Sequence, residues 1–390
     1  MQIKKLAALF LAAALLPLSG CAAFGGRNSS DNGKMRSDLS AVTCAQEMGV
    51  GINLGNTMEA YWASDDNATS GASVIGDNTP NNYETCWGAV VTTQECIDGM
   101  AAAGFETVRV PVYWGNMMED DGSFTIDPAY IARVQEIVDY CRNAGLYVII
   151  NCHHYDEFLI KHYTQEEVLH ATAVLWKQIA EYFQDYSDYL IFEGFNEALG
   201  GSQEGTELSE NERFDYVNAM NQTFVDTVRA TGGNNADRIL IVSGYYTNID
   251  YTTREEFQMP SDPADDRLMV SVHYIDNSVY WRRMVGNDRW MEYSKAQCDL
   301  LQERFTDQGI PVFVGECTSI YEPEYCIKHP QYEGSSLCLQ MLLDMAADYG
   351  FVPVLWDVND NFYSRTDCKI KEPADQAVIT EVAERIHNRS

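Results

Sequence analysis

The segment YLIFEGFNE (residues 189–197) combines a run of large apolar residues with a polar end. The apolar part is continuous rather than alternating, which is typical of a parallel strand buried on both of its faces. Asn196 and Glu197 then stand side by side where this strand would end. Because a buried carboxylate is costly unless it is paired or used, the segment predicts a strand that delivers polar groups to a site at its carboxyl end.

Seven other apolar runs of this kind recur along the chain. They are GVGINLGN (49–56), FETVRVPV (105–112), GLYVIINCHH (145–154), RILIVSGYY (238–246), LMVSVHYI (268–275), PVFVGECT (311–318) and FVPVLWDVND (351–360). Long amphipathic segments such as DPAYIARVQEIVDYCRNAG (127–145) separate most of the runs, with an Asp–Pro start and a glycine stop in this case. Between 238–246 and 268–275 the sequence shows at most a short helix. Eight strands alternating with helices predict an α/β fold, a closed (β/α)8 TIM barrel.

The alternative fold is an open, doubly wound sheet that binds a nucleotide. GVGINLG (49–55) contains three glycines, as a dinucleotide-binding turn does. The third glycine comes one position too late for G-x-G-x-x-G, and a loop-like segment follows it instead of a helix. The barrel is therefore the better interpretation.

Composition narrows the range of partners. Apolar residues make up 46% of the 390-residue chain, enough for the core of one large barrel domain. The formal net charge is −32, so the chain repels nucleic acid and anionic membrane surfaces, and a neutral partner suits it better. No C-x-x-C metal spacing occurs among the cysteines. Cys326 and Cys338 are the pair to test first for a disulfide, although the sequence alone predicts no bridge, and Cys141 and Cys298 fit buried helix positions.

The N-terminus has the pattern of an export signal. The basic segment MQIKK is followed by the apolar run LAALFLAAALLPL (6–18), which is too short to span a bilayer stably. LSGC (18–21) matches the bacterial lipoprotein cleavage signal, so we expect residues 1–20 to be removed and Cys21 to carry lipid. An ordinary secretory signal is the alternative. Residues 21–40 predict a flexible tether and residues 41–390 the barrel domain, exposed on the bacterial cell surface as a monomer.

Functional groups of a (β/α)8 barrel lie at the carboxyl ends of its strands. Nearly every predicted strand carries polar or aromatic residues there. These are Asn56, Arg109, His153, His154, Asn196, Glu197, Tyr245, Tyr246, His273, Glu316, Trp356 and Asp357. Two of them, Glu197 and Glu316, form a carboxylate pair of the kind that glycosidic bond hydrolysis needs, with one acid for the leaving oxygen and one base or nucleophile at the sugar carbon. A gap of about 5–5.5 Å between them would give retention of configuration, and a wider gap inversion.

The sequence resembles glycoside hydrolase family 5, the cellulase family, through seven motifs that follow the family's order. They are GINLGNTMEA (51–60), VRVPVYWGN (108–116), VIINCHHYDEF (148–158), FEGFNE (192–197), VSVHY (270–274), VFVGE (312–316) and VLWD (354–357). The resemblance extends over nearly the whole predicted barrel domain. It implies a retaining (β/α)8 glycosidase whose acid/base and nucleophile stand on strands four and seven.

The resemblance also implies individual roles. Glu197 would be the general acid/base, and Glu316 the nucleophile, kept ionised by Arg109. Asn196 would hydrogen-bond the sugar 2-hydroxyl, a contact that strengthens in the transition state. Trp356 would be the platform on which a sugar ring stacks. The remaining expected substrate-binding residues are Asn56, His153, His154, His273 and Tyr274. No metal or organic cofactor is implied.

Two positions depart from the family pattern. Ala198 follows the Asn–Glu pair where the family usually has proline. The His-x-Tyr of strand six reads His273, Tyr274, Ile275, so the tyrosine that normally donates a hydrogen bond to the nucleophile is missing from its usual place. Tyr274 or a loop residue such as Tyr280 would have to replace it.

The expected activity is the hydrolysis of internal β-1,4-glycosidic bonds in a plant polysaccharide such as cellulose, mixed-linkage glucan or xyloglucan. Mannan and xylan are alternatives within the same chemistry. Loops rich in aromatic residues, among them Tyr61, Trp62 and Trp87, are expected to divide between lining a cleft for this polymer and packing onto the barrel.

Two interpretations from other classes remain. A metal-dependent hydrolase could use His153, His154 and His273, but adjacent histidines on a strand point to opposite faces. A surface glycan-binding lipoprotein without catalysis is the other, and the presence of both Glu197 and Glu316 argues against it.

Overall fold

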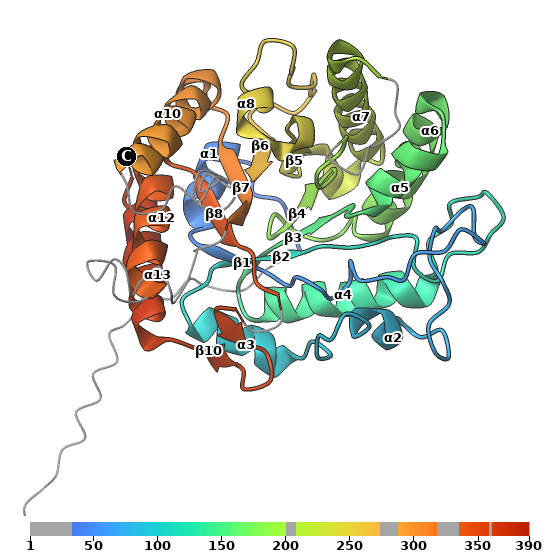
Figure 1. The fold of residues 1–390 in the computed structure, drawn as a ribbon, viewed down its shortest axis with the longest axis horizontal. Helices are drawn as coiled ribbons and strands as arrows, with labels where there is room; N and C mark the ends of the chain where they lie inside the picture. The colour runs from blue at the N-terminus through green and yellow to red at the C-terminus, as the bar shows by residue number, and fades with distance from the viewer. Residues whose placement is uncertain (1–32, 200–207, 274–287, 318–334, 359–360, 390) are drawn as a thin grey trace, which may run out of the picture. The chain divides into compact units, whose positions relative to one another are not determined.

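The computed structural model describes residues 33–199, 208–273, 288–317, 335–358 and 361–389 (Figure 1). Eight parallel strands form a closed barrel in the order β1 to β8. Their bounds are β1 Gly51–Asn53, β2 Thr107–Val110, β3 Tyr147–Asn151, β4 Leu190–Glu193, β5 Leu240–Ser243, β6 Leu268–His273, β7 Val312–Cys317 and β8 Val352–Leu355. Each strand lies inside one predicted run and ends before the last residue of that run, so the predicted barrel is confirmed. Most of the polar residues at the carboxyl ends of these runs lie in the loops that directly follow the strands.

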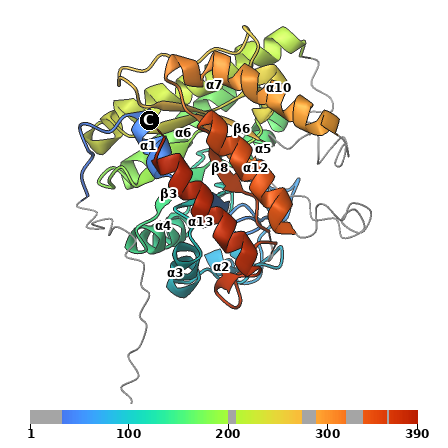
Figure 2. The same ribbon diagram turned by 90° about the vertical axis from the view of Figure 1, so that its left-hand side faces the viewer.

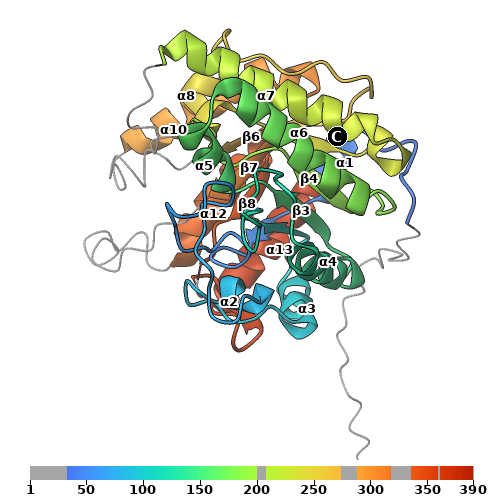
Figure 3. The ribbon, with the colours of Figure 1, turned by 90° about the vertical axis from the view of Figure 1, so that its right-hand side faces the viewer.

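The predicted helices are also present around the barrel. They are α3 Gln94–Ala102, α4 Pro128–Asn143, α6 Gln165–Tyr182, α7 Glu210–Ala230, α10 Asp288–Arg304, α12 Ser335–Tyr349 and α13 Pro373–His387. α12 and α13 pack side by side on one side of the barrel (Figure 2), and α6 and α7 on the opposite side (Figure 3). Between β5 and β6 the α-helix is the short α8, Ile249–Thr252, so the prediction that this connection lacks a long helix is confirmed.

Helix starts follow local capping chemistry. α6 and α7 each begin with a capping box, in which Thr164 and Ser209 accept from the backbone amide three residues on and Glu167 and Glu212 bond back to the cap. α4 begins at Pro128, after Asp127 has accepted hydrogen bonds from two amides of the first turn.

Several short elements were not predicted from the sequence. They are α1 Ala41–Glu47, α2 Pro80–Glu84, α5 Tyr155–His162, the 3-10 turns η1 Gly233–Ala236, η2 Tyr245–Thr247 and η3 Thr306–Gln308, and the antiparallel hairpin of β9 Tyr363–Ser364 and β10 Lys369–Ile370. Of these, α5 and the hairpin flank the site described below. Among the described residues, no helix is both long enough and apolar enough to cross a membrane.

Apolar side chains fill the lower part of the barrel, at the amino-terminal ends of its strands. Ile149, Ile191, Ile241 and Phe313 form one buried cluster with residues of α1, so α1 closes this end. A larger cluster lies between the strands and the surrounding helices. Polar groups can therefore meet at the opposite, carboxyl-terminal end.

The packed part of the chain begins earlier than predicted. Arg36 donates to Asp188 (2.6 Å) and to the Tyr147 hydroxyl (2.7 Å), and it forms an ion pair with Glu47. Leu39 is buried in the cluster beneath the barrel. The expectation of a flexible tether over 21–40 is therefore wrong for residues 33–40, whose packing depends on partners distant in the sequence. Residues 21–32 lie outside the described ranges.

Candidate active site

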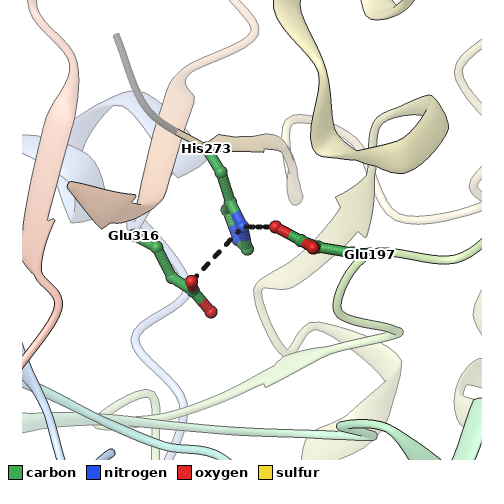
Figure 4. A group of neighbouring side chains, drawn as sticks. All are labelled: Glu197, His273 and Glu316. Carbon is green, nitrogen blue, oxygen red and sulfur yellow. Dashed lines mark hydrogen bonds and ion pairs between the residues drawn. The ribbon is translucent and has the colours of Figure 1, made fainter. Parts of the chain in front are cut away.

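Three side chains meet at the carboxyl-terminal rim of the barrel: Glu197 after β4, His273 at the end of β6 and Glu316 in β7 (Figure 4). His273 Nδ1 lies 2.9 Å from Glu197 Oε1 and 3.7 Å from Glu316 Oε2. One carboxylate oxygen of Glu197 lies within 4.8 Å of one of Glu316. This short separation fits retaining glycosidases, because inverting enzymes keep their carboxyl groups about 6.5–9.5 Å apart to admit a water molecule.

The two carboxylates differ in their access to solvent. The Glu197 side chain is 27% exposed, whereas the Glu316 side chain is 5% exposed. Glu197 is therefore open enough to exchange protons with solvent during a catalytic cycle, and Glu316 is sheltered. This division matches an acid/base and a nucleophile.

Arg109 in β2 is the cation of the site, and it is fully buried. Its Nε donates to Glu193 Oε2 (2.6 Å), Nη1 to Asn53 Oδ1 (3.0 Å) and Glu316 Oε1 (3.1 Å), and Nη2 to Asn196 Oδ1 (2.8 Å). Burial opposes its charge, but the carboxylates of Glu193 and Glu316 outweigh this effect, and the pKa of Arg109 is raised above its usual value. The guanidinium therefore stays charged and forms an ion pair with Glu316.

Three polar residues below the rim support Arg109. Glu193 is buried and accepts from Arg109 and from Ser271 Oγ (2.9 Å). Asn53 donates to the carbonyl of Gly315, next to Glu316, at 2.9 Å. Sequence analysis missed the roles of Asn53 and Ser271. The available signal was a small polar residue inside an otherwise apolar strand.

His153 and Trp356 form the floor beside the carboxylates. The His153 ring is buried and lies parallel to Trp356, with centroids 6.0 Å apart and an interplanar angle of 7°. Burial lowers the pKa of His153 well below its usual value, and the charges of His154, Arg109 and His273 add to the effect. His153 is therefore a neutral hydrogen-bonding group. Trp356 is half-buried.

The ring of His154 packs edge-on against that of His153, with centroids 4.4 Å apart and an interplanar angle of 85°. The backbone of His154 is left-handed (φ 58°) at the N-cap position of α5. Burial opposes its protonation, but Glu157, whose carboxylate lies 3.5 Å from Nδ1, and then Glu59 raise its pKa overall. Its ring centroid lies 6.2 Å from that of Tyr61 and 6.0 Å from that of Trp87. The predicted site residue is thus present, as a link between the floor and the aromatic wall.

Asn56 is held in place by a residue that sequence analysis did not single out. Its backbone is left-handed (φ 60°), and its amide donates to the carboxylate of Glu59, which also accepts from the Thr57 amide at 2.9 Å. Glu59 is fully buried, and burial raises the pKa of its carboxyl group despite these hydrogen bonds. Glu59 therefore fixes the loop that carries Asn56 to the rim.

The loop aromatics differ in burial, and their expected role in lining a cleft stays a prediction. Trp114, Tyr155, Tyr245, Phe362 and Tyr363 are buried. Tyr61 and Trp87 are half-buried beside His154, and Trp62 is 52% exposed. The replacement of the strand-six tyrosine stays a prediction, because Tyr274, Ile275 and Tyr280 lie outside the described ranges.

A metal set made from His153, His154 and His273 is not formed. Within the described ranges, the group of histidine, cysteine and carboxylate side chains close enough to share an ion is Glu197, His273 and Glu316, the same three that make up the catalytic arrangement. His153 stacks on Trp356 and His154 pairs with Glu157, and neither belongs to that group.

Comparisons with known proteins agree with this geometry. The family profile of Cellulase (glycosyl hydrolase family 5) matches residues 68–362. Endoglucanase A of Paenibacillus barcinonensis is 34% identical over 91% of this chain and 90% of its own length.

Solved structures give the same result. A broad-specificity endoglucanase from Ruminococcus champanellensis with bound cellotriose superposes with a TM-score of 0.76 at 30% identity, covering 89% of this chain and 99% of the other. A Bacteroides ovatus xyloglucanase in complex with a heptasaccharide superposes with a TM-score of 0.76 at 30% identity, covering 91% of this chain and 78% of the other. The barrel, the order of its motifs and these matches together establish that the chain belongs to glycosyl hydrolase family 5, the cellulase family.

Proposed function

We propose that this protein is a retaining endo-β-1,4-glucanase that cleaves internal bonds of β-1,4-linked glucan chains. One observation carries the proposal: carboxylate oxygens of Glu197 and Glu316 lie within 4.8 Å of each other, and both residues lie beside Nδ1 of His273. The endoglucanase names of relatives at similar identity support the choice of substrate.

The reaction takes place in two displacements. Glu316 attacks the anomeric carbon while Glu197 gives its proton to the leaving glycosidic oxygen, which forms a glycosyl–enzyme ester and releases the shortened chain. Glu197, now ionised, takes a proton from water, and the water oxygen attacks the anomeric carbon and frees Glu316. Two inversions give net retention of configuration.

Arg109 fixes the side of Asn196 that faces the substrate. A guanidinium only donates hydrogen bonds, so the atom 2.8 Å from its Nη2 is the amide oxygen of Asn196. The amide nitrogen of Asn196 is then left to donate to the sugar 2-hydroxyl, where a hydrogen bond strengthens in the transition state. His273, whose Nδ1 faces both carboxylates, orients Glu197 and contacts the substrate near the bond that is cleaved.

The aromatic wall supplies the polymer-binding surface of the proposal. Trp356 provides the stacking platform at the cleaved sugar, and His154, Tyr61 and Trp87 continue the row of rings away from it. Such rings suit the apolar faces of successive glucose units. Xyloglucan is a second candidate substrate, since it shares the β-1,4-glucan backbone and a structural neighbour is a xyloglucanase.

The test is a reducing-sugar assay on carboxymethyl-cellulose, lichenan, xyloglucan, glucomannan and xylan, with wild type and Glu316→Gln. Activity on β-glucans in the wild type and none in the variant supports the enzyme, and the first anomer seen by proton NMR should be β. Binding of glucans without turnover by the wild type would instead indicate a glycan-binding lipoprotein. Loss of activity in EDTA would point to the metal-dependent alternative.

We further propose that the chain is exported and anchored through lipid on Cys21, after removal of residues 1–20. The LSGC motif and the apolar run before it support this proposal. Membrane fractionation of cells expressing the wild type and Cys21→Ala tests it. The variant should leave the membrane fraction, and light scattering of the detergent-solubilised wild type should report a monomer.

A further inference from the structure

We propose that Cys96 and Cys368 form a disulfide bond in the exported protein, and that this bond ties the β9–β10 hairpin to α3. The inference depends on export to an oxidising compartment and not on the glucanase activity. It concerns two thiols that lie far apart in the sequence and that sequence analysis did not pair.

The hairpin and the helix are in close contact around these cysteines. Cys96 lies in the first turn of α3 and is 2% exposed, and Cys368 lies between β9 and β10. The Tyr363 hydroxyl donates to the carbonyl of Cys96 at 2.8 Å. One turn further along α3, a Cβ at Gly99 would lie only 2.3 Å from the Cys368 carbonyl oxygen. Glycine at this position is therefore what allows the backbone of Cys368 to reach the helix face that carries Cys96.

The two thiols face each other within this contact. The Cys96 and Cys368 side chains interact through a hydrogen bond, and their sulfur atoms are not covalently bonded in the structure. Cys141 on α4 interacts with Cys96 only electrostatically, whereas Cys368 also shares a side-chain hydrogen bond with Cys96. The pairing we infer is therefore Cys96 with Cys368.

Bond formation requires a partner disulfide. The two thiols lose two protons and two electrons, and a disulfide of low molecular weight or of an oxidoreductase accepts them and becomes two thiols. Burial raises the pKa of Cys96 to about 12, so this thiol is a slow nucleophile in the folded chain, and the half-buried Cys368 is the accessible one. We expect the bond to form most readily while the hairpin is still open, and to resist reduction once Cys96 is covered.

The hairpin also supports the sugar platform, which links this bond to the site. Arg365 donates to the carbonyls of Asp357 (2.6 Å) and Gly55 (2.8 Å). Asp357, the residue after Trp356, accepts from the amides of Phe362 (2.9 Å) and Tyr363 (2.8 Å). A disulfide bond at Cys368 would therefore restrain the segment that follows Trp356.

The experiment uses the purified full-length protein, unfolded under reduction and refolded in oxidised glutathione, then denatured, alkylated with N-ethylmaleimide and digested. Mass spectrometry should find a Cys96–Cys368 linked peptide that disappears on reduction. Reductant should also lower the Tm of the oxidised protein by about 5 °C, since a disulfide closing a long loop stabilises strongly.

Two variants identify the source of any Tm shift. Cys368→Ser should abolish the effect of reductant on Tm, and Cys86→Ser, which alters a half-buried cysteine elsewhere, should preserve it. Recovery of both Cys96 and Cys368 as maleimide adducts after oxidation would overturn the proposal. A linked peptide joining Cys96 to Cys141 would overturn it as well. The mass-spectrometric result on the wild type stands even if a variant fails to fold.

Discussion

Arg109 donates to Asn196 at 2.8 Å and, through its other nitrogens, to Glu193 and Glu316, so one buried side chain connects strands β2, β4 and β7. The planar guanidinium is suited to this task because its donors diverge in fixed directions. The orientation of the Asn196 amide and the position of the Glu316 carboxylate thus depend on the same group.

Arg109→Lys keeps the charge but cannot reach four acceptors from one ammonium. We expect kcat/KM on a soluble β-glucan to fall by about 10²-fold or more, because a misplaced amide and carboxylate lose transition-state contacts. The Tm should fall too, since buried acceptors lose their donors. Initial-rate kinetics and thermal unfolding measure both effects. Arg254→Lys, at a half-buried position ion-paired with Glu210 and Glu256, is the matched control, and equal kinetics in the two variants would contradict the assigned role.

Glu197→Gln and Glu316→Gln should separate the two steps of catalysis. Removing the acid should lower turnover of polysaccharide by about 10²–10⁴-fold, the usual contribution of general acid–base catalysis. On an aryl cellobioside whose leaving group needs no protonation, Glu197→Gln should still release a burst of phenolate, because Glu316 can attack. Glu316→Gln should show neither burst nor turnover. A burst in Glu316→Gln would show that the roles are assigned wrongly.

Glu59→Ala should loosen the loop that carries Asn56. The carboxylate of Glu59 accepts from the amides of Asn56 and Thr57, and these donors would be left without it. We expect KM to rise several-fold with a smaller change in kcat, because the affected rim binds sugar without touching the reacting bond. Glu59→Gln, which keeps one acceptor oxygen, should lie between wild type and Glu59→Ala. Unchanged KM in Glu59→Ala would refute a positioning role.

The order of the barrel and the catalytic pair could be predicted from the sequence because both depend on local patterns. Strands buried on two faces are continuous apolar runs, and functional groups follow them at one end. The supporting contacts could not be predicted in the same way. Asn53 and Ser271 are ordinary strand residues until the closed barrel points them inward at Arg109 and Glu193. The start of α5 was missed because it depends on the left-handed backbone of His154, and the packing of residues 33–40 depends on distant partners such as Asp188.

Trp87→Ala should reveal how far the binding surface extends. The ring lies 6.0 Å from His154 and beyond the stacking platform of Trp356, so it is expected to meet sugars remote from the cleaved bond. We expect KM for long cello-oligosaccharides to rise several-fold, while that for the shortest cleaved oligosaccharide stays near the wild-type value. The exposed Tyr182→Ala, on the outer helix α6, is the control. A loss that is equal for all chain lengths would mean that Trp87 only supports the fold.

Asp156→Asn should stabilise the protein at alkaline pH. Burial raises the pKa of the Asp156 carboxyl group to about 8, with a further rise from Glu157 and an opposing effect of His154. The folded protein therefore holds a proton that the unfolded chain loses at about pH 4, so stability falls as pH rises from about 4 towards 8. Asparagine carries no charge to bury, and its Tm should exceed that of the wild type by a few degrees at pH 8 and by much less at pH 5. Thermal unfolding from pH 5 to 9 measures this difference, and Asp265→Asn, at an exposed position, should follow the wild type. A Tm difference that does not change with pH would show that Asp156 titrates in the ordinary range and that its burial is offset by contacts of the charged form.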